Sequence, residues 1–82
     1  MTEPELLAIC TRVLRDLLGD DRIVLTMTTR RSDVPNWDSF AYVNFIVALE
    51  MECGVTFGAG EVESFEDVGA VVRRLGVLMP AR

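Results

Sequence analysis

The sequence predicts an all-α protein: a small bundle of three main helices plus one short helix, with a long loop between the first two main helices. Half of the 82 residues are hydrophobic, which suits one packed domain over residues 1–82. Apolar residues recur at helical spacing in three segments, near 3–18, 39–53 and 64–76. The β-branched stretch 23–29 has no partner strand, and an isolated strand is unstable. We therefore expect helices and no sheet.

The first helix is predicted over residues 3–18. Thr2 and Glu5 have the spacing of a capping box, Pro4 lies in the first turn, and Gly19 supplies the end. Its apolar residues recur at the i, i+3, i+4 and i+7 positions of an amphipathic helix: Leu6, Leu7, Ile9, Cys10, Val13, Leu14, Leu17 and Leu18.

Residues 19–38 are predicted to form a long ordered loop. Ile23, Leu25 and Met27 are its apolar side chains, and we expect them to pack against the helices. Loops of this length are uncommon in compact domains and are often functional.

The second helix is predicted over residues 39–53, with Gly54 as its end, and it carries too many apolar residues for one stripe. A helix that is apolar nearly all round either lies at the centre of the core or meets a partner. Both interpretations stay open. One predicted face holds Tyr42, Phe45, Ile46, Leu49 and Cys53, and the other holds Phe40, Val43, Val47 and Met51.

A short helical turn is predicted near residues 60–63. The last helix is predicted to start within residues 64–67 and to end near Gly76, with residues 77–82 as a frayed tail. Its buried stripe is predicted to be Val68, Val71, Val72 and Leu75.

The net charge of −5 is unevenly distributed. All eight bases are arginines, and none lies between Asp33 and Asp67, a stretch with eight acids when both ends are counted. Such a block repels nucleic acid and anionic membranes and attracts basic protein surfaces, although a merely solvated acidic face would look the same. No apolar run approaches the ~20 residues that span a bilayer, and the acidic N-terminus lacks the basic start of a signal peptide. A cytoplasmic protein is expected.

The residue census leaves little for catalysis. The chain has no histidine and no lysine, which excludes Ser-His and Cys-His pairs and Schiff-base chemistry. Cys10 and Cys53 are isolated at apolar positions, which favours reduced core thiols over a disulfide or a metal site. We expect no metal and no independent enzymatic activity.

Ser39, at the start of the second predicted helix, is the residue that stands out. It is either a helix cap, since Asp38 and Ser39 are both good N-cap residues, or a point of attachment. A phosphodiester there would meet the positive end of the helix dipole. The two interpretations are compatible.

The surroundings of Ser39 carry a family resemblance. Trp37-Asp38-Ser39-Phe40, followed by the run 43–50, resembles the acyl carrier protein family, and the similarity continues through 54–57 and 65–69 and more weakly over the first helix. The resemblance implies that Ser39 carries 4′-phosphopantetheine, added from coenzyme A by a phosphopantetheinyl transferase, which makes the chain a phosphoprotein. The arm would hold an acyl group as a thioester.

The same resemblance implies partner enzymes that supply the chemistry: acyltransferases or ligases and synthase-type enzymes, with basic surfaces that dock on the acid-rich segment. Asp38 would help to bind the transferase, and a monomer is expected. The residues assigned to partner and transferase recognition are Asp38, Phe40, Val43, Asn44, Val47, Glu50 and Met51.

Two departures from the family pattern favour a specialised pathway such as polyketide or other secondary metabolism. Phe40 replaces the leucine usual after the serine, and the second helix has few acids. An aminoacyl or peptidyl carrier and a carrier of fatty acid synthesis are alternatives. From other classes, an unmodified helical adaptor that binds through this helix and a thiol protein using the two cysteines stay open. Six residues are candidates to line a cargo cleft: Leu6, Leu25, Phe45, Leu49, Val62 and Val72.

Overall fold

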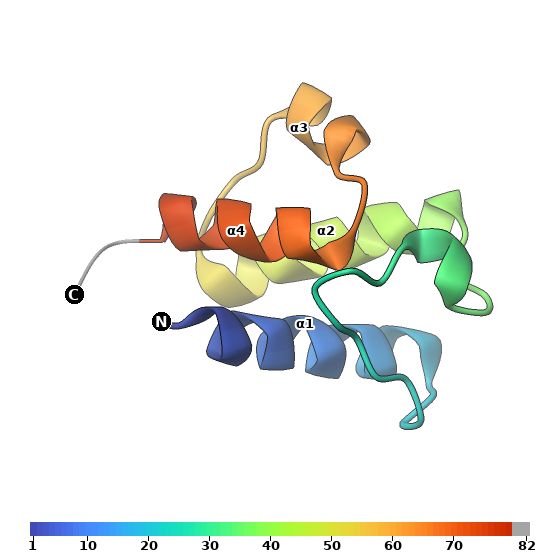
Figure 1. Cartoon of the computed structure of the whole chain (residues 1–82). Coiled ribbons are helices and arrows are strands. Elements are labelled where there is room, and N and C mark those ends of the chain that lie inside the picture. Colours follow the sequence, from blue (N-terminus) through green and yellow to red (C-terminus); the bar gives the residue numbers. More distant parts are fainter. Residues whose placement is uncertain (80–82) are drawn as a thin grey trace.

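The computed structural model describes residues 1–79, and within them it is all-helical. Its elements are α1 (Glu3–Leu18), η1 (Arg31–Asp33, a 3₁₀ helix), α2 (Ser39–Cys53), α3 (Ala59–Ser64) and α4 (Val68–Leu78). Helix α1 packs against both α2 and α4, and the short α3 lies on the side of α4 away from α1 (Figure 1). The predicted bundle of three main helices and one short helix, without strands in this part of the chain, is confirmed.

Helix α1 has the predicted bounds and the predicted caps. The Thr2 hydroxyl accepts a hydrogen bond from the Glu5 N–H, and a Glu5 carboxylate oxygen accepts one from the Thr2 N–H at 2.9 Å. At the other end Gly19 adopts the left-handed conformation, with φ of 66°, and its N–H donates to the Arg15 carbonyl. Both ends are therefore specified by local sequence.

The ends of α3 and α4 differ from the prediction. Helix α3 is Ala59–Ser64, one residue longer at each end than predicted. Helix α4 begins at Val68, because Asp67 caps it by accepting the Ala70 N–H at 2.9 Å. It also runs past Gly76 to Leu78, so the predicted tail is helical at 77–78, and residues 80–82 lie outside the described part.

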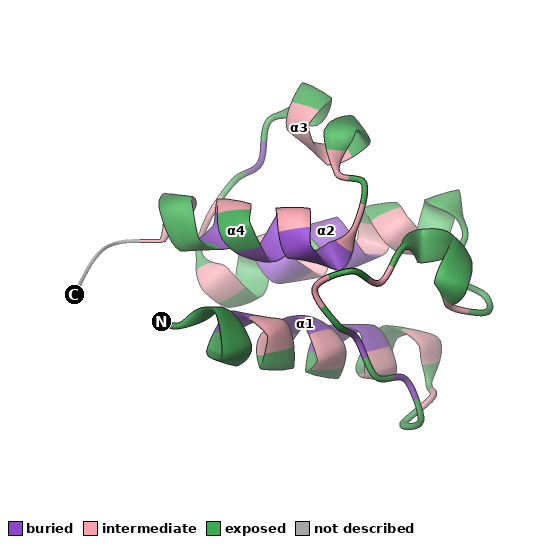
Figure 2. Ribbon diagram, viewed as in Figure 1, coloured by how far each residue is buried: buried purple, intermediate pink, exposed green. Residues whose placement is uncertain are grey.

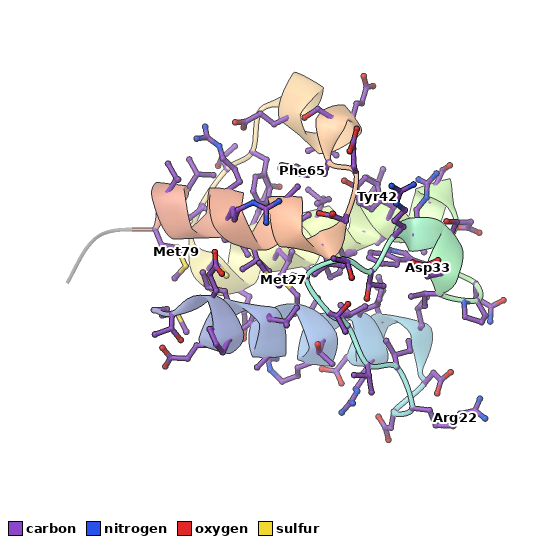
Figure 3. The ribbon with its side chains drawn as sticks, in the orientation of Figure 1. Arg22, Met27, Asp33, Tyr42, Phe65 and Met79 are labelled. Atoms are coloured by element: carbon purple, nitrogen blue, oxygen red, sulfur yellow. The ribbon has the colours of Figure 1, made fainter. Side chains whose placement is uncertain are left out.

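The long loop is confirmed as ordered, and the start of α4 holds it. The Val68 N–H donates to the Thr29 carbonyl at 2.9 Å and the Gly69 N–H donates to the Met27 carbonyl at 2.7 Å, so Met27 lies against this helix end (Figure 3). A Cβ at Gly69 would lie 2.4 Å from the Met27 carbonyl oxygen. Glycine is therefore required at this close approach of two backbones.

One hydrophobic core joins the long helices. The inward faces of α1, α2 and α4 are buried, whereas α3 is exposed or half-buried along its length (Figure 2). The predicted stripe of α4 is buried, as are Ile23 and Leu25 of the loop, while Met27 is half-buried. The fully buried side chains are Leu6, Cys10, Leu14, Phe45, Leu49, Val72 and Leu75.

Both cysteines are free, as predicted, but only one belongs fully to the core. Cys10 has no exposed surface, and burial together with the nearby Cys53 raises the pKa of its thiol to about 12. Cys53 is half-buried, so the expectation that both thiols are buried is wrong for this one. Cys10 is thus an inert core thiol.

Candidate functional site

Asn36 and Trp37 fix the course of the chain just before α2. Asn36 adopts the left-handed conformation, with φ of 68°, which asparagine tolerates better than most residues. Trp37 follows and is only 5% exposed. Its ring packs edge-on against Phe45 at 5.1 Å between centroids and lies 6.2 Å from the Tyr42 ring. Trp37 therefore anchors the segment that precedes the helix.

Asp38 is the N-cap of α2, and Ser39 is the first residue of the helix. A carboxylate oxygen of Asp38 accepts a hydrogen bond from the Ala41 N–H at 2.8 Å. The interpretation of Ser39 as the cap is therefore wrong, because Asp38 already fills that position. Ser39 is exposed, and its hydroxyl forms no hydrogen bond with any of residues 1–79. This serine is available for chemistry without loss of the cap.

The start of α2 also has two free backbone donors beside the Asp38 carboxylate. Within the described residues, the N–H groups of Ser39 and Phe40 find no acceptor, as expected for the first turn of a helix. Their partial positive charge adds to the helix dipole, which favours an anionic group at this end. A phosphodiester on the Ser39 oxygen would lie near these two free N–H groups.

An open cleft of about 1110 Å³ lies beside Ser39. It runs between α2 and the α3 segment, with Val43 and Ile46 on one wall and Val62 and Phe65 on the other. Of the six residues predicted to line a cargo cleft, Val62 alone does so. The other five, Leu6, Leu25, Phe45, Leu49 and Val72, are buried in the core.

Tyr42 joins the two walls of this cleft. The sequence pattern did not indicate this role. Its hydroxyl donates to the Val62 carbonyl at 2.7 Å, which ties α2 to α3, and burial raises its pKa. The Arg31 guanidinium lies over the Tyr42 ring at 5.4 Å, where η1 meets the start of α2 (Figure 3). The fold thus brings Arg30 and Arg31 to the cleft that contains Ser39. In the sequence, the only indication of this placement was that Arg30 and Arg31 lie just before the stretch without bases.

The residues predicted for partner recognition divide into two groups. Phe40, Val43, Val47 and Met51 are 78%, 53%, 45% and 81% exposed. The other three lie differently. Asp38 is exposed at the cap, Asn44 is half-buried, and Glu50 is half-buried with its carboxylate accepting the Phe57 N–H at 2.8 Å.

Two further findings concern residues 1–79. No cluster of three or more histidine, cysteine or acidic side chains is placed to hold a metal ion there. Among these residues, no helix is both long and apolar enough to pass through a bilayer.

Comparison with known proteins identifies the fold. A scan against protein-family models finds no match, and neither does a search of curated proteins. Among solved structures, the chain is similar to a holo acyl carrier protein from Geobacter metallireducens, with a TM-score of 0.81 and 33% identity. The match covers 88% of this chain and 83% of that one. The chain belongs to the acyl carrier protein family.

Proposed function

We propose that Ser39 carries 4′-phosphopantetheine and that residues 1–82 form one carrier domain. The observation that supports this most directly is the exposed, unpartnered Ser39 hydroxyl on a helix that Asp38 already caps. A serine whose only role was capping would engage its hydroxyl with a backbone N–H. The similar structure is that of a holo carrier, which accords with a modified serine.

The modification itself requires a separate enzyme. The Ser39 oxygen attacks the phosphorus next to pantetheine in coenzyme A, a new P–O bond forms, and the P–O bond of the diphosphate breaks to release the nucleotide half. The hydroxyl proton passes to a base of the transferase, since the chain has no histidine or lysine. The Asp38 carboxylate uses one oxygen for the Ala41 N–H, which leaves the other for the transferase or its metal ion.

The arm then holds the acyl group as a thioester, and partner enzymes carry out the chemistry. These would be acyltransferases or ligases and synthase-type enzymes, as the family resemblance implies. The scarcity of acids on α2 and the aromatic Phe40 favour polyketide or other secondary metabolism over fatty acid synthesis, with an aminoacyl or peptidyl cargo as the nearest variant. The carrier is proposed to act as a cytoplasmic monomer.

The carrier proposal is preferred to an unmodified adaptor that binds through α2, because Asp38 rather than Ser39 caps this helix and the Ser39 side chain is exposed. A thiol function is also disfavoured, since the burial that raises the pKa of Cys10 opposes thiolate formation.

Intact mass spectrometry tests the proposal. After incubation with coenzyme A and a broad-specificity phosphopantetheinyl transferase, the wild-type chain should gain the mass of one phosphopantetheine. Ser39→Ala should gain none while keeping its helical circular dichroism. Ser32→Ala, which removes another exposed serine near the site, is the matched control and should gain the full mass. An unmodified wild type, or a gain that survives Ser39→Ala, would refute the proposal.

A further inference from the structure

We propose that Arg31 binds the phosphodiester of the arm proposed for Ser39, and so holds the root of the arm beside η1 at the start of α2. This contact depends on the proposed modification of Ser39, and it lies within the chain rather than with a partner enzyme. It makes Arg31 a positioning residue for the arm.

The Arg31 guanidinium lies near the turn of α2 that holds Ser39. Its Cζ is 5.4 Å from the centroid of the Tyr42 ring. Tyr42 follows Ser39 by three residues on α2, and side chains of a helix lean back toward its N-terminus. The Tyr42 ring is therefore directed toward the turn of Ser39. The three residues line the same cleft.

The Tyr42 ring is held in place on two sides. Its hydroxyl donates to the Val62 carbonyl at 2.7 Å, and its ring lies 6.2 Å from that of the buried Trp37. The backbone of η1 is also fixed, because the Arg30 N–H donates to an Asp33 carboxylate oxygen at 2.9 Å. A guanidinium stacked on such a ring is preorganised, so it loses less conformational freedom when it binds an anion.

Arg31 forms no ion pair with a described residue, although many carboxylates are close to it. Five acids line the same cleft: Asp38, Glu50, Glu63, Glu66 and Asp67. Ion pairs within residues 1–79 involve four other arginines: Arg12, Arg22, Arg73 and Arg74. The stacked guanidinium therefore keeps N–H donors at its edge for another anion. Arginine suits a phosphate, because its planar fork can donate two parallel hydrogen bonds.

The charges of the cleft favour the η1 side for a phosphate tethered at Ser39. Glu63 and Glu66 are exposed, line the cleft from the α3 side and form no ion pair with another described residue. They repel an anion from that wall. Arg30 and Arg31 line the cleft from the η1 side and attract it. The rest of a pantetheine arm is uncharged, so these acids do not oppose it.

A carboxylate at the end of an acyl cargo is the other anion that the arm could bring to Arg31. The phosphodiester is favoured because its bond to Ser39 fixes it close to the guanidinium, at a high effective concentration. A terminal carboxylate lies at the far end of a flexible arm, and its binding would require the whole arm to be ordered.

The test compares the unmodified and the modified form of each variant, so that effects on folding shared by both forms cancel. Arg31→Gln removes the charge, and Arg31→Lys keeps the charge without the planar fork. Arg22→Gln is the matched control, because Arg22 is another exposed arginine and pairs with Asp20 outside the cleft. The transferase converts each variant with coenzyme A, and intact mass confirms the conversion. The readouts are the melting temperature of both forms and phosphorus NMR of the modified form.

We expect modification to raise the melting temperature of the wild type by about 3 °C at low salt, as one partly exposed charged contact predicts for a domain of this size. Arg31→Gln should lose this gain, Arg31→Lys should keep about half of it, and Arg22→Gln should keep all of it. The gain should shrink between about 0.05 and 0.5 M salt. The phosphorus resonance should move with salt in the wild type and stay constant in Arg31→Gln.

Equal gains in the wild type and Arg31→Gln, with the same phosphorus resonance, would overturn the proposal while full conversion still supported modification of Ser39. A wild type that is not converted would overturn both. A gain that appears only when the arm carries an acyl group ending in a carboxylate, such as malonyl, and that Arg31→Gln abolishes, would assign Arg31 to the cargo instead of the phosphodiester.

Discussion

Helices α1 and α2 are built alike on the inside and differently on the outside. Each has a side-chain N-cap, Thr2 or Asp38, and each ends at a left-handed glycine, Gly19 or Gly54. Each buries several large residues in the same core. The outer face of α1 is largely polar, with Leu17 its one exposed large hydrophobic residue, at 38%. The outer face of α2 carries the exposed apolar side chains of Phe40, Val43, Val47 and Met51.

This difference separates what folding requires from what function requires. A surface helix of a small domain needs one apolar face, and α1 has that pattern. Helix α2 has a second apolar face that the chain does not cover. The start of that face adjoins Ser39, the residue proposed to carry the arm. The simplest account is that the inner face of α2 serves the bundle and the outer face serves a partner.

The largest expected effect tests the similarity of the inner faces. Leu14 of α1 and Leu49 of α2 are both fully buried. Leu14→Ala and Leu49→Ala should each lower the free energy of unfolding by about 3 to 4 kcal/mol, through lost burial and the remaining cavity. Urea denaturation measures both. A loss below about 1 kcal/mol in one variant alone would show that the two helices do not share one core.

The second prediction concerns pH. The pKa of Cys10 is raised to about 12 by burial, so the folded chain holds this proton more tightly than the unfolded chain, whose thiol titrates near ~8.5. The contribution of the protonated Cys10 thiol to the free energy of unfolding is fully present below pH ~8. It falls as the pH rises, by about 3 kcal/mol at pH 11. Urea titrations from pH 8 to 11 measure the slope.

Cys10→Ala provides the control for this slope, since it should be less stable at pH 8 but lose less between pH 8 and 11. If the free energy of unfolding of Cys10→Ala falls with pH as steeply as that of the wild type, other groups cause the loss of stability at alkaline pH. Thiol labelling of the native protein should also be faster at the half-buried Cys53 than at Cys10.

Loss of the N-cap of α1 or of α2 should lower the free energy of unfolding by similar amounts, smaller than those expected for the core variants. Thr2→Ala and Asp38→Ala should each cost about 1 kcal/mol, because each leaves an N–H of the first turn without its acceptor. Asp38→Asn should retain most of the cap and so isolate the carboxylate charge. If Asp38→Asn is stable but is modified more slowly than wild type, the charge acts on the transferase. Thermal unfolding and the mass assay give the two readouts.

The smallest effect on stability is expected where the helices differ most. Leu17→Gln on α1 and Val47→Thr on α2 should each change the free energy of unfolding by less than about 0.5 kcal/mol, because Leu17 is 38% and Val47 is 45% exposed and neither packs in the core cluster. Modification should slow for Val47→Thr alone. A large loss of stability in Val47→Thr would mean that the outer face of α2 serves folding after all.

Local sequence predicted α1 and α2 to the residue because strong caps and a terminal glycine mark both ends of each. The sequence placed the start of α4 only within residues 64–67. Asp67 begins the helix because the next two N–H groups meet the carbonyls of Thr29 and Met27, about 40 residues away in the sequence. No local pattern reports such a contact.

In the candidate site, too, local sequence predicted some features, whereas others depend on contacts made only in the folded chain. The position of Ser39 at the start of a helix followed from the sequence, but its freedom from capping depends on which of two neighbouring side chains turns back to the Ala41 N–H. The lining of the cleft was missed for a similar reason. It depends on Tyr42 reaching the Val62 carbonyl and on Arg31 folding back over the Tyr42 ring.

The bonds from Val68 and Gly69 to the loop carbonyls have a mechanical consequence. They complete the hydrogen bonding of the first turn of α4 with acceptors from the segment that leads to Ser39. The loop and this helix end therefore open together, as one cooperative unit, and their amides should exchange with solvent at a common rate. Any partner that pulls on the arm at Ser39 acts on a segment that is hydrogen-bonded to the start of α4, and Val68 of that helix lines the same cleft as Ser39.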